Sequence, residues 1–257
     1  LFTNVPANSV INGLDVDLVY EVPLQFHQEE LDNTIMTYLQ IWTGSPKLQP
    51  WVDLIDSYKN HHDEVDIAFI GKYVAHRDSY ESLNEALLHG GIANQLKVNL
   101  HYVDSELLTE KNVLSQLKKM DGVLVAPGFG ERGTEGKIAA IKIARTKNIP
   151  FFGICLGMQM AIVEFARNVV GIEGANSGES RPDHPENVID LMPEQEGQEE
   201  TGGTMRLGSQ TTILEKGTRI EKIYNKTTIS ERHRHRYEVM NYFVPRFEEA
   251  GLTVSGR

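Results

Sequence analysis

The sequence runs Phe151-Phe152-Gly153-Ile154-Cys155-Leu156-Gly157-Met158-Gln159 where an apolar strand is followed at once by a helix, and the one cysteine of the chain lies between them. A nucleophile on such a bend has a strained backbone, and glycines on either side avoid side-chain clashes. The N–H groups that begin the helix lower the pKa of a thiol and stabilise an oxyanion. A lone cysteine can also be a small buried apolar residue. Here the two glycines favour a nucleophile, with the Leu156 N–H as one oxyanion donor.

Strands and helices alternate on both sides of this stretch. Apolar runs predict strands at 65–71, 98–103, 122–125 and 151–154, and apolar residues at helical spacing predict helices at 79–89, 113–120, 137–146 and 158–169. Gly90-Gly91 is expected to stop the first of these helices. This order predicts an α/β fold, a doubly wound and mostly parallel sheet with helices on both faces. Its ligand site is expected at the carboxyl ends of the strands.

Other regions of the sequence differ from this pattern in composition. Residues 14–22 are apolar enough to predict a strand or buried edge, and residues 31–41 predict an amphipathic helix. Residues 41–64, with their prolines and a polar, His-rich end, predict a linker before a main domain at 65–257. Residues 181–203 are rich in Glu, Pro, Gly and Gln and predict a mobile surface excursion, whereas residues 210–214 predict a short strand.

A second oxyanion donor is expected from the loop that follows a neighbouring strand. Pro127-Gly128-Phe129-Gly130 comes directly after the predicted strand at 122–125. Glycine-rich turns are common in α/β loops, so this turn has meaning only beside the Cys155 bend. We expect the Gly128 N–H to be the second donor.

Composition limits the class of protein. The 257 residues carry a formal net charge of −11, which argues against general binding to nucleic acids or membrane surfaces. No apolar run approaches the roughly 20 residues that span a bilayer. A single cysteine excludes an internal disulfide and fits a reducing, cytoplasmic compartment. The start, Leu1-Phe2-Thr3, does not look like a signal peptide and is typical of the middle of a longer polypeptide.

The motif at 153–159 resembles the nucleophile motif of class I glutamine amidotransferases. More narrowly, stretches along almost the whole chain are similar to the CTP synthase family, and jointly they are more specific than the bend alone. They are Asp15-Val16-Asp17, Tyr20 to Leu24, Gly71 to Val74, Gly128 to Lys137, Ile149 to Asn168, Ala175 to Ser177, Gly202 to Gly208 and Glu231 to Val239.

The resemblance implies a ligase of pyrimidine biosynthesis that makes CTP from UTP, ATP and L-glutamine. Glutamine is hydrolysed in the amidotransferase domain, ammonia passes to an amidoligase domain of the same polypeptide, and the enzyme forms homotetramers. ATP, UTP and Mg²⁺ are bound mostly by the amidoligase domain, and GTP is an allosteric activator. Residues 1–40 then resemble the C-terminal end of that second α/β domain.

Roles are implied for individual residues as well. Cys155 is the nucleophile, while Gly128, Leu156, Gly157, Met158 and Gln159 line the glutamine and its oxyanion. Glu179 and Arg236 hold the α-amino and α-carboxylate groups, which chemically require one anion and one bidentate cation. Without the resemblance, the run Arg232 to Arg236 is a solvated basic patch or a nucleic-acid contact. Val16 resembles a residue of the nucleotide site, and no metal ligand is assigned.

The sequence departs from the family pattern in two places. Many members have Pro-Gly-Gly-Phe-Gly at 126–130, whereas this chain has Pro127, which has no N–H and cannot donate to an oxyanion; Gly128 keeps its amide. The general base and its carboxylate partner come, in this family, from a Phe-His-Pro-Glu segment that would follow Arg257. We therefore expect a fragment that is inactive by itself. His184-Pro185-Glu186 has the right letters, but a loop turn is its better interpretation.

Two other functions remain open from the sequence. The chain could be another class I glutaminase-like hydrolase that shares the bend around Cys155. It could also be a catalytically silent glutamine-binding or assembly module. Modification of Cys155 by a glutamine-analogue alkylator distinguishes a competent thiolate from the silent module.

Overall fold

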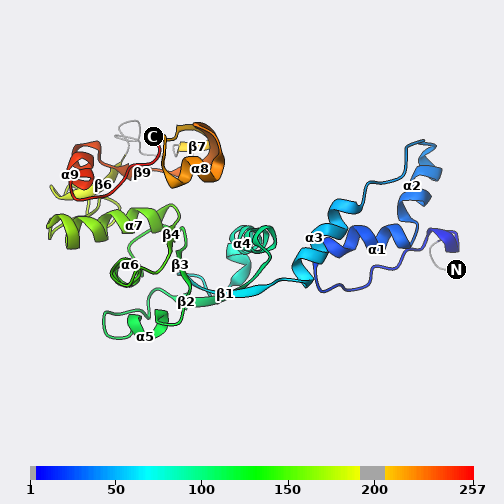
Figure 1. Cartoon of the computed structure of the whole chain (residues 1–257), viewed down its shortest axis with the longest axis horizontal. Helices are drawn as coiled ribbons and strands as arrows, with labels where there is room; N and C mark the ends of the chain where they lie inside the picture. Colours follow the sequence, from blue (N-terminus) through cyan, green and yellow to red (C-terminus); the bar gives the residue numbers. More distant parts are fainter. Residues whose placement is uncertain (1–3, 192–205) are drawn as a thin grey trace. The chain divides into compact units, whose positions relative to one another are not determined.

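The structure is a computed structural model that describes residues 4–191 and 206–257. The chain divides into two compact units (Figure 1), which we call unit 1 (Leu1–Val65 and Tyr80–Asn99) and unit 2 (Asp66–Ser79 and Leu100–Arg257). Within the described residues, no helix has both the length and the apolar character needed to cross a membrane.

Unit 1 is built mainly from short helices. They are η1 (Ala7–Ser9), η2 (Val19–Glu21), α1 (Val22–Gln28), α2 (Leu31–Leu39), α3 (Gln49–Lys59) and α4 (Glu81–Asn94). Helix α2 confirms the helix predicted at 31–41. The strand or buried edge predicted at 14–22 is wrong, because irregular chain leads there into η2 and α1. Pro23 lies in the first turn of α1, where the fixed φ of proline favours a helix start over a strand.

Helices are present at two places in unit 1 where the sequence predicted a linker or a helix end. Pro50 lies in the first turn of α3, so this proline begins a helix inside the predicted linker. The stop predicted at Gly90-Gly91 is wrong, because α4 continues to Asn94 and ends at Gln95, whose φ is 55°. A β-carbon on Gly91 would lie 2.6 Å from the Leu96 carbonyl oxygen. Gly91 therefore allows a close approach of the backbone rather than ending the helix.

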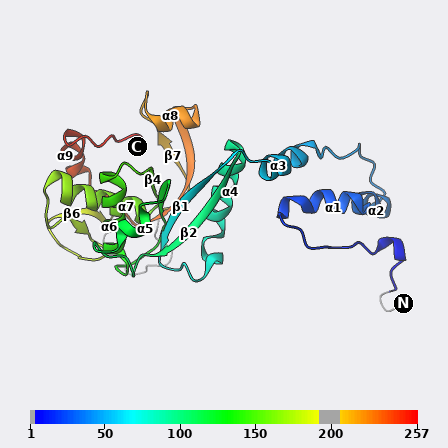
Figure 2. The same cartoon turned by 60° about the horizontal axis from the view of Figure 1, so that its bottom comes forward.

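The central sheet has the strand order β2-β1-β3-β4. Its strands are β1 (Asp63–Gly71), β2 (Leu96–Asp104), β3 (Gly122–Val125) and β4 (Phe151–Gly153), and Figure 2 shows β1 and β2 as its long members. Strand β3 pairs in parallel with β1 and β4, and Val125 is in register with both Ile70 and Gly153. The predicted parallel sheet of an α/β fold is confirmed. This register places the ends of β3 and β4 side by side.

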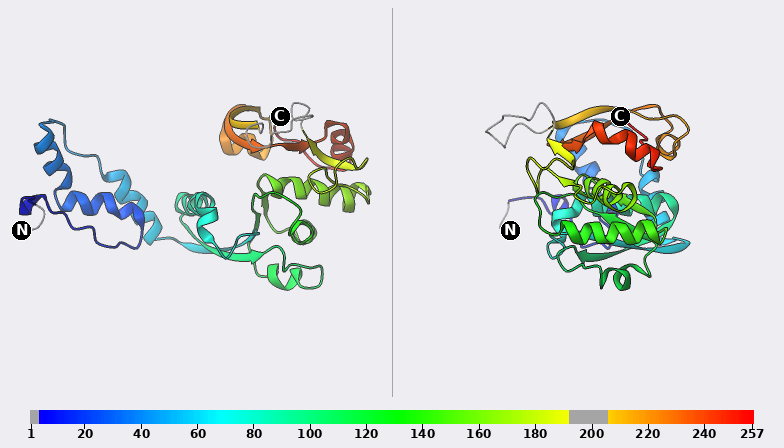
Figure 3. Two further views of the ribbon diagram at one scale, coloured as in Figure 1. Left: turned by 180° about the vertical axis from the view of Figure 1, so that it is seen from behind. Right: turned by 90° about the vertical axis from the view of Figure 1, so that its left-hand side faces the viewer.

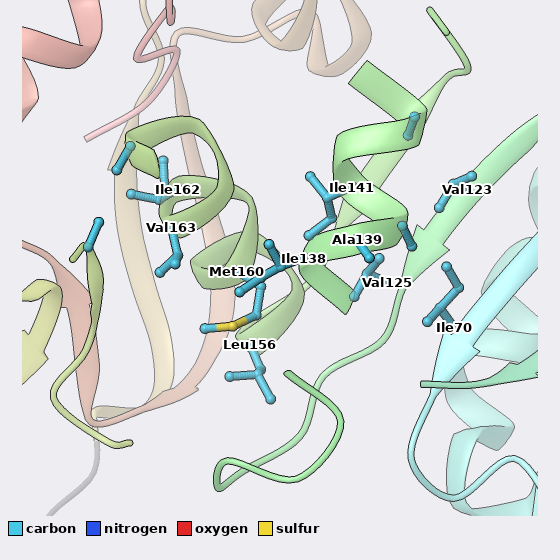
Figure 4. Close-up of a cluster of buried hydrophobic side chains, with 14 of the residues drawn as sticks. Ile70, Val123, Val125, Ile138, Ala139, Ile141, Leu156, Met160, Ile162 and Val163 are labelled. Atoms are coloured by element: carbon cyan, nitrogen blue, oxygen red, sulfur yellow. The ribbon is translucent and has the colours of Figure 1, made fainter. Parts of the chain in front are cut away.

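Helices of unit 2 supply the other half of its core. They are η3 (Arg77–Tyr80, which ends at the boundary of the unit), α5 (Val113–Leu117), α6 (Thr134–Thr146), α7 (Leu156–Phe165) and a π-helical turn, η4 (Ala166–Val170). Figure 4 shows Ile138 and Ile141 of α6 beside Met160 of α7, with Val125 of β3 on the sheet side. These side chains are less than 9% exposed. The packing fixes α6 and α7 against the strand ends that carry the site.

The remainder of unit 2 adds a small sheet and a hairpin. The sheet is β5 (Asn176–Ser177), β6 (Asn187–Leu191) and β9 (Tyr237–Val239), and β7 (Arg206–Ile213) pairs antiparallel with β8 (Thr228–His235). The small sheet packs against α7 (Figure 3). Further elements are α8 (Arg219–Tyr224), η6 (Asn241–Phe243) and α9 (Val244–Glu249). Strand β7 confirms the strand predicted at 210–214.

The surface excursion predicted at 181–203 is wrong for residues 187–191, whereas residues 181–186 lie in mostly exposed turns. Residues 187–191 form β6, and Asn187, Val188 and Ile189 are buried. Composition was a poor guide there because one antiparallel partner, β9, is more than 45 residues away in the sequence. The rest of that prediction, residues 192–203, lies outside the described residues. So do residues 202–205, which begin the stretch Gly202 to Gly208 that resembles the CTP synthase family.

Candidate functional site

Cys155 lies on a sharp bend between β4 and α7, as the sequence predicts. Its φ is 54° and its ψ is −112°, a conformation that costs a residue other than glycine about 1–3 kcal/mol. A β-carbon on Gly153 would lie 2.7 Å from the carbonyl carbon of Gly157, and one on Gly157 would overlap the carbonyl oxygen of Val125. Both glycines are therefore needed for the bend that presents the thiol.

The thiol of Cys155 faces two backbone N–H groups, those of Leu156 and Gly128. Each of them lowers the pKa of the thiol, but burial outweighs both and raises that pKa above its ordinary value. The sequence predicted a lowered thiol pKa from the helix N-terminus, and this net direction is wrong. The two N–H groups nevertheless converge on the sulfur, next to the atom that an attacked carbonyl group would approach, which makes them candidate oxyanion donors.

Two buried lysines hold the loop that contains Gly128. Lys137 of α6 donates from Nζ to the carbonyl oxygen of Ala126 at 3.0 Å. Lys72, which follows β1, donates to the carbonyl oxygens of Phe129 at 2.6 Å and Gly130 at 2.7 Å. Burial lowers the pKa of both lysines, that of Lys137 to about 8. The loop at 126–130 is thus held by two ammonium groups, one from α6 and one from the bend that follows β1.

Strand β8 lies opposite the bend and closes a cavity. The cavity has a volume of about 240 Å³, and its walls are Cys155, Met158 and Gln159 on one side and Arg232 to His235 on the other. The thiol lies 3.9 Å from the Arg234 carbonyl oxygen, and the Arg234 guanidinium lies 6.0 Å from the centre of the Phe129 ring. The cavity can receive a small polar molecule next to the sulfur atom.

Glu179 and Arg236 both lie near this cavity, at positions far apart in the sequence. Glu179 follows β5, and its Oε1 accepts a hydrogen bond from the Gly130 N–H at 2.7 Å. Burial raises the pKa of the Tyr237 phenol, the charge of Glu179 raises it further, and the charge of Arg236 lowers it. The charge of Glu179 also adds to the raised pKa of Cys155. One anion and one cation therefore act on the same phenol beside the thiol.

The remaining predicted residues have different surroundings. Leu156 is buried, Met158 is exposed at the cavity, and the Gln159 side chain donates to the Tyr237 carbonyl oxygen at 3.0 Å. Val16 lies in irregular chain of unit 1, whereas the other predicted site residues lie in unit 2. His184-Pro185-Glu186 forms a turn in which the Glu186 N–H donates to His184 Nδ1, so the loop interpretation is confirmed.

Sequence reasoning missed Lys72, Lys137 and Tyr237. A signal for Lys137 was present, because it shares the apolar stripe of α6 with Ala140, Ile141 and Ala144, where a charged residue is unusual. For Tyr237 there was no such signal, because its position beside Glu179 arises only from the sheet of β5, β6 and β9. In the part of the chain that the structure describes, no three His, Cys, Asp or Glu residues gather as a metal site.

The chain is similar to known proteins along its whole length. The family model for class I glutamine amidotransferases matches residues 75–257. The chain is 51% identical to a CTP synthase of Geobacter metallireducens over 257 residues, which is 100% of this chain and 48% of that protein. It is 52% identical to a CTP synthase of Geobacter sulfurreducens, with the same coverage. The chain therefore spans about half the length of these relatives.

A solved structure is also similar to this chain. It is the glutaminase domain of Trypanosoma brucei CTPS with bound acivicin, which is 39% identical with a TM-score of 0.67. The likeness covers 75% of this chain and 74% of that one.

Proposed function

Because this chain belongs to the class I glutamine amidotransferase family, we propose that Cys155 hydrolyses L-glutamine and that the ammonia aminates UTP in a CTP synthase reaction. The observation that carries the proposal is the thiol of Cys155 on its bend, faced by the N–H groups of Gly128 and Leu156. The similarity to CTP synthases along the whole chain supports the choice of UTP as the acceptor.

Hydrolysis proceeds in two steps through a covalent intermediate. The Cys155 thiolate attacks the side-chain amide carbon of glutamine, and the carbonyl oxygen becomes an oxyanion that accepts hydrogen bonds from the Gly128 and Leu156 N–H groups. The C–N bond then breaks, the nitrogen takes the proton that the Cys155 thiol gave up and leaves as ammonia, and a thioester remains. Water attacks the thioester, the C–S bond breaks, and glutamate and the thiol are released.

Glu179 and Arg236 select an amino acid as the substrate. A carboxylate binds the α-ammonium group, and a guanidinium binds the α-carboxylate with two parallel hydrogen bonds. Their shared effect on Tyr237 supports a position for both groups at the same end of the cavity. Met158 and Gln159 line the same cavity as the sulfur atom and Tyr237.

Residues 1–40 are proposed to be the end of the amidoligase domain, residues 41–64 the linker, and residues 65–257 the amidotransferase domain. Exposed apolar side chains in unit 1 support a covering partner there: Trp42 is 96% exposed, and Tyr38 and Leu39 are more than 60% exposed. In this proposal the amidoligase domain binds ATP, UTP and Mg²⁺, with Val16 at the edge of the nucleotide site. GTP activates glutamine hydrolysis, and the enzyme is a cytoplasmic homotetramer.

Substitution of the nucleophile tests the proposal. Cys155→Ala in the native polypeptide is expected to abolish glutamine-dependent CTP formation and to leave ammonia-dependent CTP formation intact. The measurement is CTP production from UTP and ATP with either nitrogen source. Equal loss of both activities in a folded variant would sink the assignment, and so would CTP formation from glutamine that persists at the rate of the unmodified protein.

A further inference from the structure

Lys137 is completely buried, which is rare for a lysine. An ammonium group without water is costly unless it is paired or solvated by polar groups of the protein. Its Nζ donates to the Ala126 carbonyl oxygen at 3.0 Å, directly after strand β3. The side chain therefore passes through the apolar stripe of α6 to reach the start of the loop that contains Gly128.

The ammonium group lies beneath Gly128 itself. A β-carbon on Gly128 would lie 3.8 Å from Lys137 Nζ, 3.9 Å from the Lys72 side chain and 3.6 Å from the Leu156 side chain. Residue 128 thus rests on two lysine side chains on the side where any side chain of its own would project. A glycine at this position leaves the ammonium of Lys137 in close reach of the loop backbone.

The two lysines fix opposite ends of the loop. Lys72 holds the carbonyl oxygen of Phe129, while the N–H of the same peptide, that of Gly130, donates to Glu179. Because a trans peptide is planar, its oxygen and its N–H point in opposite directions, and this peptide is held from both sides. Lys137 holds the other end at Ala126. The Gly128 amide lies between these two attachments.

The charge of Lys137 also acts on the thiol. Lys137 lowers the pKa of Cys155, and Cys155 in turn raises that of Lys137, so the thiolate and the ammonium stabilise each other. Glu179 acts in the opposite sense on the thiol. Other charged or titratable side chains also line the cavity that contains the thiol. They come from the wall between β8 and β9 and are Arg232, His233, Arg234, His235 and Glu238.

We propose that Lys137 is a positioning residue of the Cys155 site: its ammonium holds the Ala126 carbonyl, keeps the Gly128 N–H directed at the sulfur, and stabilises negative charge there. This role rests on the proposed function and deepens it, because the cysteine that Lys137 supports is the proposed nucleophile of glutamine hydrolysis. Lys72 acts at the far end of the same loop. Lys137 is therefore the lysine that both holds the loop beside Gly128 and acts on the charge of the thiol.

The test is the rate at which iodoacetamide alkylates Cys155, followed from pH 6 to 10 by mass spectrometry of the peptide that contains it. Lys137→Met removes the charge and keeps the apolar length of the side chain. Its alkylation rate at pH 7, where the Lys137 ammonium of the unmodified protein is still charged, is expected to fall about tenfold, and the difference between the two proteins is expected to narrow above pH 8, where Lys137 loses its proton. Lys142→Met is the matched control, because Lys142 lies on the same helix with its Nζ on Glu110.

A folded Lys137→Met variant with the pH profile of the unmodified protein would overturn the proposal. If that variant does not fold, Lys137→Gln takes its place, and the same slow alkylation at pH 7 is expected. Glutamine hydrolysis measured beside alkylation separates the two proposals. Absence of hydrolysis in the native polypeptide, which is expected to supply the general base, counts against the function of Cys155, whereas the alkylation profiles report on Lys137 alone.

Discussion

Gly157 packs directly on the backbone carbonyl of Val125, so that a β-carbon at residue 157 would overlap that oxygen. This contact joins the first turn of α7 to the end of β3 and holds the bend that carries Cys155. The substitution Gly157→Ala must therefore move α7 away from β3. We expect it to lower the free energy of unfolding by about 1–3 kcal/mol and to slow alkylation of Cys155. Urea unfolding and the alkylation rate measure the two effects.

Gly90 gives the matched control for this prediction. It lies inside α4, where a β-carbon would meet nothing within 4 Å, and its φ is ordinary for a helix. Gly90→Ala is expected to raise the free energy of unfolding by up to about 1 kcal/mol, because alanine is the better helix former. The same effect of alanine at residues 90 and 157 would contradict the role given to the Val125 contact.

Burial of Lys137 has a consequence for stability against pH. Its pKa is lowered to about 8 in the folded protein, while an unfolded lysine has a pKa near 10.4. Between these values the unfolded chain binds more protons than the folded chain, so the contribution of Lys137 to stability rises with pH. The stability of Lys137→Met relative to the unmodified protein is expected to fall by about 3 kcal/mol from pH 7 to pH 10.5.

Urea unfolding at several pH values gives this difference. The Lys142→Met variant is expected to follow the unmodified protein across the range, because its ammonium is partly exposed on the surface of α6. A constant difference between Lys137→Met and the unmodified protein would show that Lys137 titrates at the same pH in the folded and unfolded chain.

The bend at Cys155 was predictable because its determinants are local. Gly153, Cys155 and Gly157 are neighbours in the sequence, and a strand that meets a helix at a cysteine requires small residues there. The direction of the thiol pKa was not predictable in this way. It depends on how deeply β8 and the loop at 126–130 bury the sulfur, and these segments approach Cys155 only in the folded chain.

The two wrong predictions in unit 1 have different physical causes. Residues 14–22 have the β-branched and apolar content of a strand, but Pro23 occupies the first turn of α1, where its fixed φ is favourable. Pro50, which was expected to break the pattern, begins α3 inside the predicted linker. Gly91 is needed because its backbone packs closely against Leu96, and the local sequence pattern does not indicate this contact.

Gln159 is expected to contribute mainly by holding strand β9. Its buried amide donates to the Tyr237 carbonyl oxygen at 3.0 Å, next to Arg236. Gln159→Ala leaves that carbonyl without this donor and is expected to lower the free energy of unfolding by about 1–3 kcal/mol. It is also expected to raise the KM for glutamine, because Arg236 loses a fixed neighbour. Gln116→Ala, on an exposed position of α5, is expected to change stability by less than about 0.5 kcal/mol.

Glu179 gives a prediction in which two measurements move in opposite directions. Glu179→Gln keeps an oxygen that can accept the Gly130 N–H but removes the charge that raises the pKa of Cys155. Alkylation by neutral iodoacetamide at pH 7 is therefore expected to become faster, because more of the thiol is ionised. The KM for glutamine is expected to rise about tenfold to a hundredfold, because a charged hydrogen bond to the α-ammonium group contributes about 1.5–3 kcal/mol.

The opposite signs separate a role in substrate binding from general damage to the site. A variant whose loop at 126–130 has collapsed would lose both glutamine affinity and thiol reactivity, since Gly130 anchors that loop to residue 179. Glu173→Gln, at an exposed position a few residues earlier, is the control and is expected to change neither quantity. An unchanged KM with faster alkylation would leave Glu179 as an electrostatic neighbour of the thiol and assign the α-ammonium group to another anion.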